Sequence, residues 1–158
     1  FSPGEKVLCL CNGKFGHMFA DVAEACDLEV QRIFTEWLAP VTTEQIDEAL
    51  QQDLAIKGVT VIHNDTSTAV INPIAEIGNI VRRHARLLLV DCISSLGAME
   101  FKMADWQVDA AITASQKGLM TPTGISFVAI NQRGWAAVEK STNPGYYVNF
   151  KNISLSLL

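Results

Sequence analysis

The sequence predicts an α/β fold with three layers (αβα), in which helices cover both faces of a mainly parallel β-sheet. Short apolar runs alternate along the chain with segments of helical periodicity, which is the pattern of βαβ units. Several of these runs are continuously apolar, as expected for parallel strands that are buried on both faces.

The clearest of the expected strands ends on a carboxylate. Four successive aliphatic residues, from Leu87 to Val90, precede Asp91. The expected strands cover residues 7–11, 28–34, 58–63, 86–91, 109–113 and 125–130.

Helices are expected between these strands. The segments 17–26 and 133–140 have helical patterns, and residues 42–50 start with the polar pattern of a capping box. A further helix is expected to start at Pro73, because proline suits the first turn and Ile74, Ile77 and Val81 recur along one face. Residues 12–16 and 64–69 are expected to be loops.

Composition excludes several classes of function. The chain has 158 residues, a formal charge of −5 and 18% charged residues, so it gains nothing from contact with a nucleic-acid backbone. Its longest apolar stretch is far shorter than the ~20 residues that span a bilayer, so no membrane partner is expected. The length suits one domain. Because the chain begins at Phe1 and enters a strand almost at once, we expect it to be part of a longer protein.

The four cysteines show no metal-site spacing. Cys9 and Cys11 share one strand, while Cys26 and Cys92 are isolated, and no Cys-x-x-Cys pair occurs. We therefore expect free structural thiols, no metal, and a reducing compartment, the cytoplasm.

Two ionisable residues follow predicted strands, where ligands bind in parallel sheets. Asp91 either caps a loop or directs a negative charge toward a bound cation. Lys117 follows the strand 109–113 and is either a solvated surface lysine or a partly desolvated amine. In the second case its pKa falls and the neutral amine is available for imine chemistry.

Two further features are ambiguous when taken alone. Phe15 lies between Gly13 and Gly16, where its ring either folds back on the core or covers a flat ligand. Residues 63–68 form a run of small hydrogen-bonding side chains after a strand, as in either an ordinary polar loop or a binding loop.

Four ordered sequence blocks resemble one family, the class V, fold-type I pyridoxal-phosphate aminotransferases of the alanine–glyoxylate and serine–pyruvate branch. Residues 12–16 (NGKFG) resemble its Asn-Gly-x-aromatic-Gly loop, and residues 63–69 (HNDTSTA) its His-x-Glu-Thr-Ser-Thr-Gly segment. Residues 90–97 (VDCISSLG) resemble Val-Asp-x-x-Ser-Ser-x-Gly, and residues 115–119 (SQKGL) resemble Ser-Gln-Lys-Ala/Gly-Leu.

The resemblance implies a cofactor, pyridoxal 5'-phosphate, and a role for each matching residue. Lys117 would form the Schiff base with the cofactor and act as general base and acid. Asp91 would pair with the pyridine nitrogen, and Thr66 would hydrogen-bond the ring's 3′ oxygen.

Three further residues would contact the same cofactor. Phe15 would stack on its ring, and Gln116 and Ser115 would lie beside its phosphate. Two positions depart from the family pattern: Asp65 replaces the usual glutamate and Ala69 the usual glycine.

The activity implied is transfer of an amino group from a small amino acid, of alanine or serine type, to a 2-oxo acid of glyoxylate or pyruvate type. Residues 1–140 would form the core of the large cofactor domain, without its N-terminal part, and residues 141–158 would begin the connection toward the small C-terminal domain. The resemblance also implies a homodimer. We expect this segment alone to be inactive, because the phosphate-binding loop and the substrate-carboxylate arginine of the family would lie outside it.

Alternatives remain within and outside enzymology. A Rossmann dehydrogenase is disfavoured because Cys11 breaks the Gly-x-Gly-x-x-Gly fingerprint. Another class V reaction, such as a lyase or a desulfurase, is a nearer alternative. A desulfurase would carry a histidine where Gln116 stands and a later cysteine, yet none follows Cys92. A non-catalytic scaffold of the same fold would have no reason to keep Lys117, Asp91 and Thr66 together.

Overall fold

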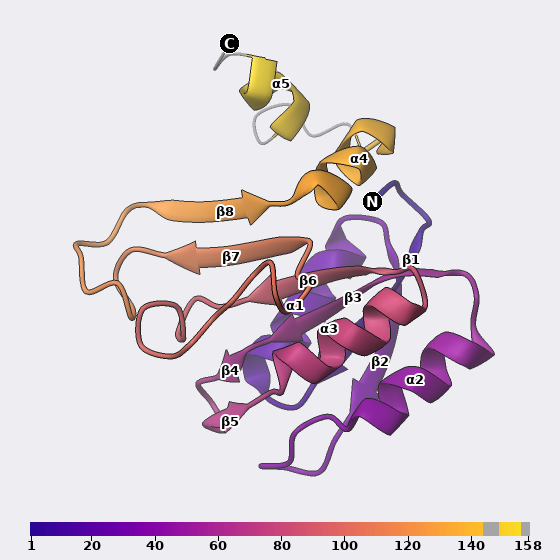
Figure 1. Cartoon of the computed structure of the whole chain (residues 1–158), viewed down its shortest axis with the longest axis horizontal. Helices are drawn as coiled ribbons and strands as arrows, with labels where there is room; N and C mark the ends of the chain where they lie inside the picture. Colours follow the sequence, from indigo (N-terminus) through magenta and orange to yellow (C-terminus); the bar gives the residue numbers. More distant parts are fainter. Residues whose placement is uncertain (144–148, 156–158) are drawn as a thin grey trace.

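The computed structural model describes residues 1–143 and 149–155, and its main sheet lies between helices (Figure 1). The strands are β1 (Lys6–Cys11), β2 (Glu29–Phe34), β3 (Ile56–Ile62), β4 (Asn64–Asp65), β5 (Val70–Ile71), β6 (Leu87–Asp91), β7 (Ala110–Ala114) and β8 (Ser126–Ile130). The helices are α1 (Lys14–Ala25), α2 (Thr43–Gln52), α3 (Ile74–Arg83), α4 (Gln132–Lys140) and α5 (Phe150–Leu155).

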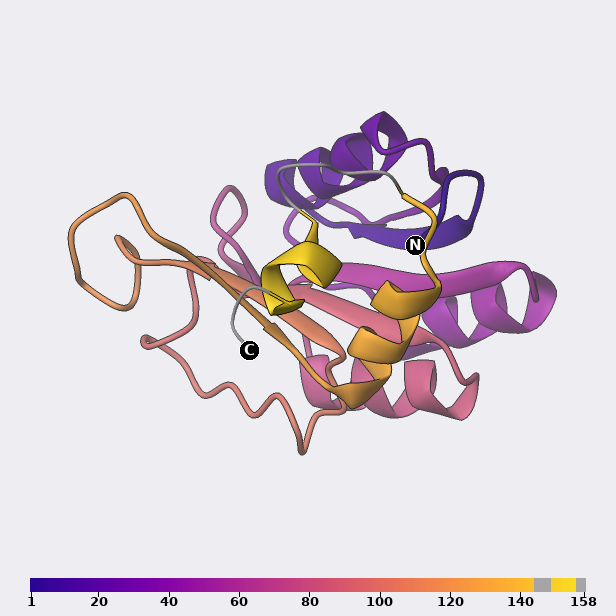
Figure 2. The same cartoon turned by 90° about the horizontal axis from the view of Figure 1, so that it is seen from above.

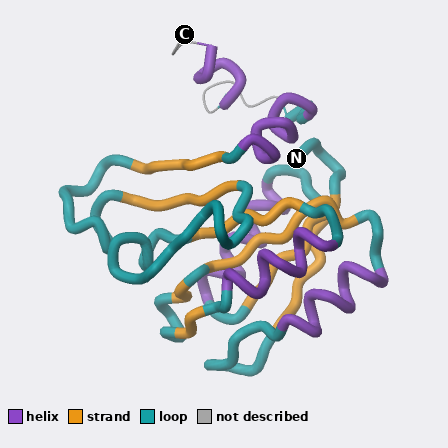
Figure 3. Tube along the Cα trace, in the orientation of Figure 1, coloured by secondary structure: helices purple, strands orange, loops and turns teal. Residues whose placement is uncertain are grey.

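The main sheet has six strands in the order β2-β1-β3-β6-β7-β8 (Figure 3). Neighbouring strands are parallel except β8, which runs antiparallel to β7. The predicted mainly parallel sheet is therefore confirmed. The parallel strands all end at one edge, named here the carboxyl edge, and they start at the opposite one, the amino edge.

Helices cover both faces of the sheet, as Figure 2 shows, with α1 on one face and α2 and α3 on the other. Alternate residues of β1 point to opposite faces of the sheet. Val7 and Cys9 pack in a cluster with Ala20 of α1, whereas Leu8 and Leu10 belong to the larger core on the other face. A strand buried on both faces must be apolar throughout, which explains the uninterrupted run at its centre.

The capping-box prediction for α2 is confirmed. Thr42 Oγ1 accepts a hydrogen bond from the Gln45 backbone N–H at 3.3 Å, and Gln45 Oε1 accepts one from the Thr42 backbone N–H at 3.1 Å. Start signals of this local kind are readable in sequence because every atom involved lies within one turn.

The predicted start of α1 was wrong. The helix begins at Lys14 rather than at residue 17, so Phe15 lies in its first turn and not in a loop. Gly13, at the N-cap, has no side chain with which to cap the helix. The cap comes instead from Asp65 on β4, far away in sequence, and a local pattern cannot reveal it.

The segment 64–69, predicted as a loop, contains part of a small hairpin. β4 and β5 pair antiparallel, with Asp65 opposite Val70. Behind the hairpin, Asn72 Nδ2 donates to the Ile62 carbonyl at 2.7 Å, and the Asn12 side-chain amide donates to Asn72 Oδ1 at 2.9 Å. This buried amide pair joins the ends of β1 and β3, where the strand order reverses and where α/β sheets bind ligands.

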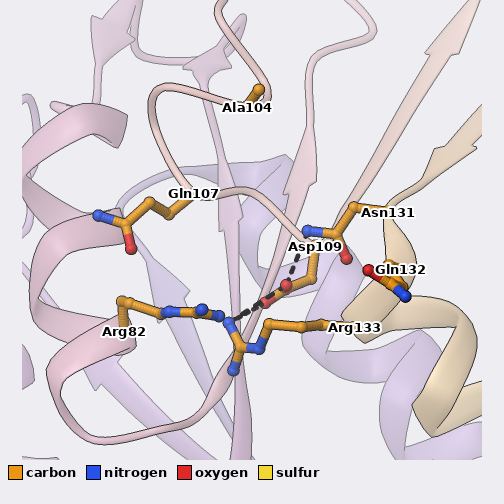
Figure 4. A pocket seen from close by; sticks show the side chains of 7 residues that line it. All are labelled: Arg82, Ala104, Gln107, Asp109, Asn131, Gln132 and Arg133. Carbon is orange, nitrogen blue, oxygen red and sulfur yellow. Dashed lines mark hydrogen bonds and ion pairs between the residues drawn. The ribbon is translucent and has the colours of Figure 1, made fainter.

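An ion pair between the buried Asp109 and the partly exposed Arg133 anchors α4 at the amino edge. The Asp109 carboxylate accepts hydrogen bonds from the Leu88 backbone N–H and the Asn131 side chain, both at 2.9 Å. Arg133 Nη1 lies 3.3 Å from the same carboxylate (Figure 4). A hollow of about 220 Å³ lies beside this ion pair, and its lining includes Asp109, Asn131, Arg133, Arg82 and Gln107.

The predicted connecting segment is described in part. α5 contacts α4 through the rings of Phe150 and Trp135, whose centroids are 6.4 Å apart. Residues 144–148 and 156–158 lie outside the described residues. The division into 1–140 and 141–158 therefore stays a prediction. Among the residues that the structure describes, no helix has the length and apolarity needed to cross a bilayer.

Candidate active site

The predicted site residues all follow, or pack beside, the ends of strands at the carboxyl edge, but their environments differ. Phe15 and Asp91 are half-buried and line one hollow. Ser115 is buried, whereas Thr66, Gln116 and Lys117 are exposed.

The hollow lies between α1 and the ends of β6 and β7 and has a volume of about 170 Å³. Apart from Asp91, its walls are apolar: the lining residues are Phe15, Met18, Phe19, Val22, Asp91, Ile93 and Ile112. A cavity with one carboxylate among apolar side chains suits a flat, mostly apolar ligand that carries one positive charge.

Asp91 is held rigidly and lacks a cationic partner. Its backbone carbonyl accepts the His63 N–H at 2.8 Å, and its Oδ1 accepts the Ile93 N–H at 2.8 Å. In the described parts of the chain no basic side chain forms an ion pair with it. Burial, and to a smaller degree the nearby charge of Asp65, raises the pKa of the Asp91 carboxyl. A bound cation would reverse that shift, because an opposite charge favours the ionised form.

Phe15 is positioned by hydrogen bonds to its backbone. Asp65 Oδ2 accepts the backbone N–H groups of Phe15 and Gly16, both at 3.0 Å. These are N–H groups of the first helical turn, which have no partner within the helix. The same carboxylate therefore fixes the point from which the Phe15 ring enters the hollow.

His63, which directly follows β3, stabilises the loops at the carboxyl edge. It is buried, and its Nδ1 shares a hydrogen bond of 2.9 Å with Ser95 Oγ. The rings of Phe101 and Trp106 pack against it, each with a centroid distance of 5.7 Å. Burial lowers the pKa of His63, which favours the neutral imidazole. Its contact with Ser95 joins the loop after β3 to the loop after β6.

Lys117 belongs to a turn whose backbone is tightly fixed. Ser115 Oγ donates to the Pro122 carbonyl at 2.6 Å, and its backbone N–H donates to the Ile125 carbonyl at 3.0 Å. Gly97 packs on the turn from the loop after β6, where a Cβ would lie 2.8 Å from the Gly118 carbonyl oxygen.

The Lys117 side chain is exposed in the described chain, which corresponds to the solvated alternative and not to the partly desolvated one. The turn projects beyond the end of β7, and β8, which follows it, is itself exposed along most of its length. No neighbouring layer of described residues covers the amine.

Thr66 lies in the turn between β4 and β5, and the turn closes through a hydrogen bond of 2.8 Å from the Ala69 N–H to the Asp65 carbonyl. Ala69 has a φ of 57°, in the left-handed region that favours glycine. The backbone thus explains why this position suits the glycine of the family pattern.

The four cysteines are free, and Cys9, Cys11 and Cys92 are buried. Burial raises the pKa of both Cys11 and Cys92 to about 11, so these thiols stay protonated at neutral pH. Within residues 1–143 and 149–155, no cluster of histidine, cysteine and acidic side chains could hold a metal ion.

The family model described as aminotransferase class-V matches residues 2–156. The chain belongs to this family. Class-V aminotransferases depend on pyridoxal phosphate and have the fold-type I architecture. The family and the fold expected from the four sequence blocks are therefore confirmed.

Relatives of this chain are named for different activities. The chain is 39% identical to a serine–glyoxylate aminotransferase of Methylorubrum extorquens, with 86% of this chain and 35% of that protein covered. It is 36% identical to an L-aspartate–glyoxylate aminotransferase of Paracoccus denitrificans (97% and 40% covered). Identity is also 36% to a protein named soluble hydrogenase 42 kDa subunit of Anabaena cylindrica (94% and 39% covered).

The solved alanine–glyoxylate aminotransferase of Nostoc sp. superposes with a TM-score of 0.92 at 28% identity, and the match covers 98% of this chain and 41% of that one. The chain thus spans about two fifths of the length of the relatives that it matches.

The sequence identified Asp65 only as a departure from the family pattern and not as a member of the site. Once the structure places the N-cap of α1 at Gly13, the missing capping side chain becomes visible, but the sequence does not show which residue supplies the cap. A cap must then come from elsewhere in the fold.

Proposed function

We propose that this chain carries the cofactor-binding core of a pyridoxal-phosphate-dependent aminotransferase. The enzyme would transfer an amino group from a small amino acid, of alanine or serine type, to a 2-oxo acid of glyoxylate or pyruvate type. One observation carries the proposal: Phe15 and Asp91, from distant parts of a class-V chain, line the same apolar hollow at the carboxyl edge. The glyoxylate-dependent relatives support the substrate class.

The hollow fits the cofactor ring in shape and charge. When bound, the cofactor supplies an electron sink for negative charge at the substrate α-carbon. Phe15 would cover one face of the ring from the first turn of α1. Asp91 would hold a proton on the pyridine nitrogen by charge pairing, which its partly desolvated position strengthens.

The exposed residues would complete the site from its rim. Lys117, on a turn fixed by Ser115, would bind the cofactor covalently through Nζ and then move the substrate proton as general base and acid. Thr66 would donate to the ring oxygen. Gln116 would lie on the phosphate side, together with the buried Ser115.

We propose that the complete enzyme is a homodimer in the cytoplasm. Three large apolar residues are 61–68% exposed at the carboxyl edge: Phe34, which ends β2, and Trp37 and Leu38, which follow it. Large apolar side chains grouped in this way are typical of association surfaces. Free thiols, three of them buried, are consistent with a reducing compartment.

The test is Lys117→Ala in the complete enzyme, with Lys57→Ala as the matched control. Lys57 is also exposed but lies at the start of β3, near the amino edge. We expect Lys117→Ala to lose transamination and the borohydride-reducible link to the cofactor, while the control retains both. If the Lys117 variant kept that reducible link, the assignment of the lysine would be wrong. If the unaltered enzyme bound the cofactor without any turnover on small amino acids, the scaffold alternative would hold.

A further inference from the structure

Asp65 is a buried carboxylate whose charge is balanced without a basic side chain. Its relative exposure is 0%, and no ion pair joins it to a lysine or arginine within the described residues. Burying an ionised carboxylate is costly unless donors replace the lost water. The role of Asp65 therefore follows from the donors that surround it.

Four hydrogen bonds reach this carboxylate, and they come from two segments. Oδ2 accepts the Phe15 and Gly16 N–H groups at the start of α1, both at 3.0 Å. Oδ1 accepts the backbone N–H and the hydroxyl of Ser67, at 3.0 and 2.7 Å. The partial positive charge of the helix start adds to these bonds.

The two segments carry proposed cofactor contacts. Phe15 belongs to the first segment, and Thr66 lies between Asp65 and Ser67 in the second. Ser67 Oγ strengthens the link by accepting the Lys14 N–H at 2.8 Å. Asp65 therefore holds together two parts of the chain that lie 50 residues apart.

Gly13 shows how closely the chain packs on this carboxylate. Its φ of −179° is extended backbone that any residue can adopt, so conformation does not require glycine here. A Cβ at this position would clash with the Asp65 carboxylate itself. Glycine is therefore needed at this position only because the backbone approaches the Asp65 carboxylate so closely.

We propose that Asp65 is a positioning residue, which caps α1 from β4 and thereby fixes Phe15 and Thr66 relative to each other across the cofactor site. The expected effect on cofactor binding rests on the proposed function, since Phe15 and Thr66 matter together only if the cofactor lies between them. The cap itself is independent of any ligand.

The test compares Asp65→Ala with Asp65→Asn and uses Asp109→Asn as the control, all in the complete enzyme. Asparagine keeps an oxygen that can accept the Phe15 and Gly16 N–H groups, and it is a good N-cap, whereas alanine removes the cap. Asp109 is an equally buried carboxylate at the amino edge, where no cofactor contact is proposed. Hydrogen exchange is measured on the cofactor-free proteins, and the dissociation constant of pyridoxal phosphate is measured by titration.

We expect Asp65→Ala to lose protection of the Phe15 and Gly16 amides and to bind the cofactor about tenfold more weakly, the scale of one lost helix cap. Asp65→Asn should restore protection of the two amides but only part of the cofactor affinity, because its Nδ2 cannot accept the Ser67 N–H that Oδ1 accepts in the parent. Asp109→Asn should unfold more readily and yet bind the cofactor with the parent's affinity. If Asp65→Ala does not fold, Gly13→Ala displaces the same carboxylate and should produce the same two losses.

Normal protection of both amides in Asp65→Ala would refute the cap. Lost protection with unchanged cofactor affinity would refute the positioning role. If the parent itself did not bind the cofactor, the proposed function would fail, and the exchange data would still decide whether Asp65 caps α1.

Discussion

Both edges of the sheet bury carboxylates, but the charges are balanced in different ways. At the amino edge, Asp109 is paired with Arg133 and accepts hydrogen bonds from Leu88 and Asn131. At the carboxyl edge, Asp65 is balanced by three backbone N–H groups and the Ser67 hydroxyl. The Asp91 carboxylate accepts one hydrogen bond and has no cation from the described residues.

This difference separates a structural site from a binding site. A paired carboxylate such as Asp109 has its charge satisfied by the fold and needs nothing further. Asp91 lies in an apolar hollow with a raised pKa, so its environment favours a positively charged ligand over an empty cavity. Groups whose protonation is perturbed in a cleft are candidates for function, whereas ion pairs of the Asp109 kind hold elements together.

The strongest test of the comparison is Asp91→Asn in the complete enzyme. An uncharged amide no longer favours the protonated pyridine nitrogen, so we expect kcat to fall by about 10³-fold, equivalent to ~4 kcal/mol. The cofactor should remain bound, because Lys117 and Phe15 are unchanged. Steady-state kinetics with a small amino acid and glyoxylate measures the effect. Turnover at the parent's rate would mean that Asp91 merely caps the loop through Ile93.

Asp109→Asn should show the opposite profile. Removing one partner of this ion pair leaves Arg133 uncompensated, although its partial exposure limits the penalty to about 2–3 kcal/mol of unfolding free energy. Urea unfolding of the enzyme measures the loss, and kcat should stay within about twofold of the parent. A large fall in kcat in a stably folded variant would remove the distinction between the two edges.

The pH dependence of cofactor-free stability sharpens the comparison. Because the folded-state pKa of Asp91 lies above its ordinary value of 3.8, its neutral form is the one that stabilises the fold. That contribution is complete below the ordinary value and is lost as pH rises through the folded-state pKa.

Asp91→Asn without cofactor should therefore be more stable than the parent at neutral pH, and the difference should shrink as pH falls toward 3.8. Denaturant midpoints of both proteins across this range provide the measurement. If the greater stability of Asp91→Asn over the parent persisted unchanged at low pH, its cause would not be the Asp91 charge.

The smallest expected effect concerns backbone strain, which both edges share. Ala69 at the carboxyl edge and Ala85 after α3 both have a φ of 57°. Glycine relieves this strain at the cost of greater freedom in the unfolded chain. Ala69→Gly and Ala85→Gly should therefore each stabilise the protein by about 0.5–1 kcal/mol. Thermal unfolding tests both. A gain at one position alone would show that the strain belongs to one edge.

The sequence was sufficient wherever the determining interactions are local or repeat with a short period. Three signals predicted their elements because each lies within a few residues: the capping box at Thr42, the proline that lies at the N-cap of α3, and the run from Leu87 to Val90. The ordered motifs around Phe15, Asp91 and Lys117 indicated the family before any contact was known.

The tertiary structure decided what depends on residues far apart in the chain. The start of α1 depends on Asp65, which lies on another strand, and the antiparallel course of β8 depends on how the chain returns beside β7. An apolar pattern indicates that a strand is buried, but it does not show which neighbouring strand it pairs with. The meeting of Phe15 and Asp91 in one hollow, and the exposure of Lys117 on its turn, likewise follow from packing between layers. The sequence by itself therefore determined the six strands of the main sheet, the helices between them, the family and most candidate residues, but not the β4–β5 hairpin, α5 or the role of Asp65. The fold alone determined the spacing and environment of these residues, because hydrogen bonds and burial act between residues that the sequence places far apart.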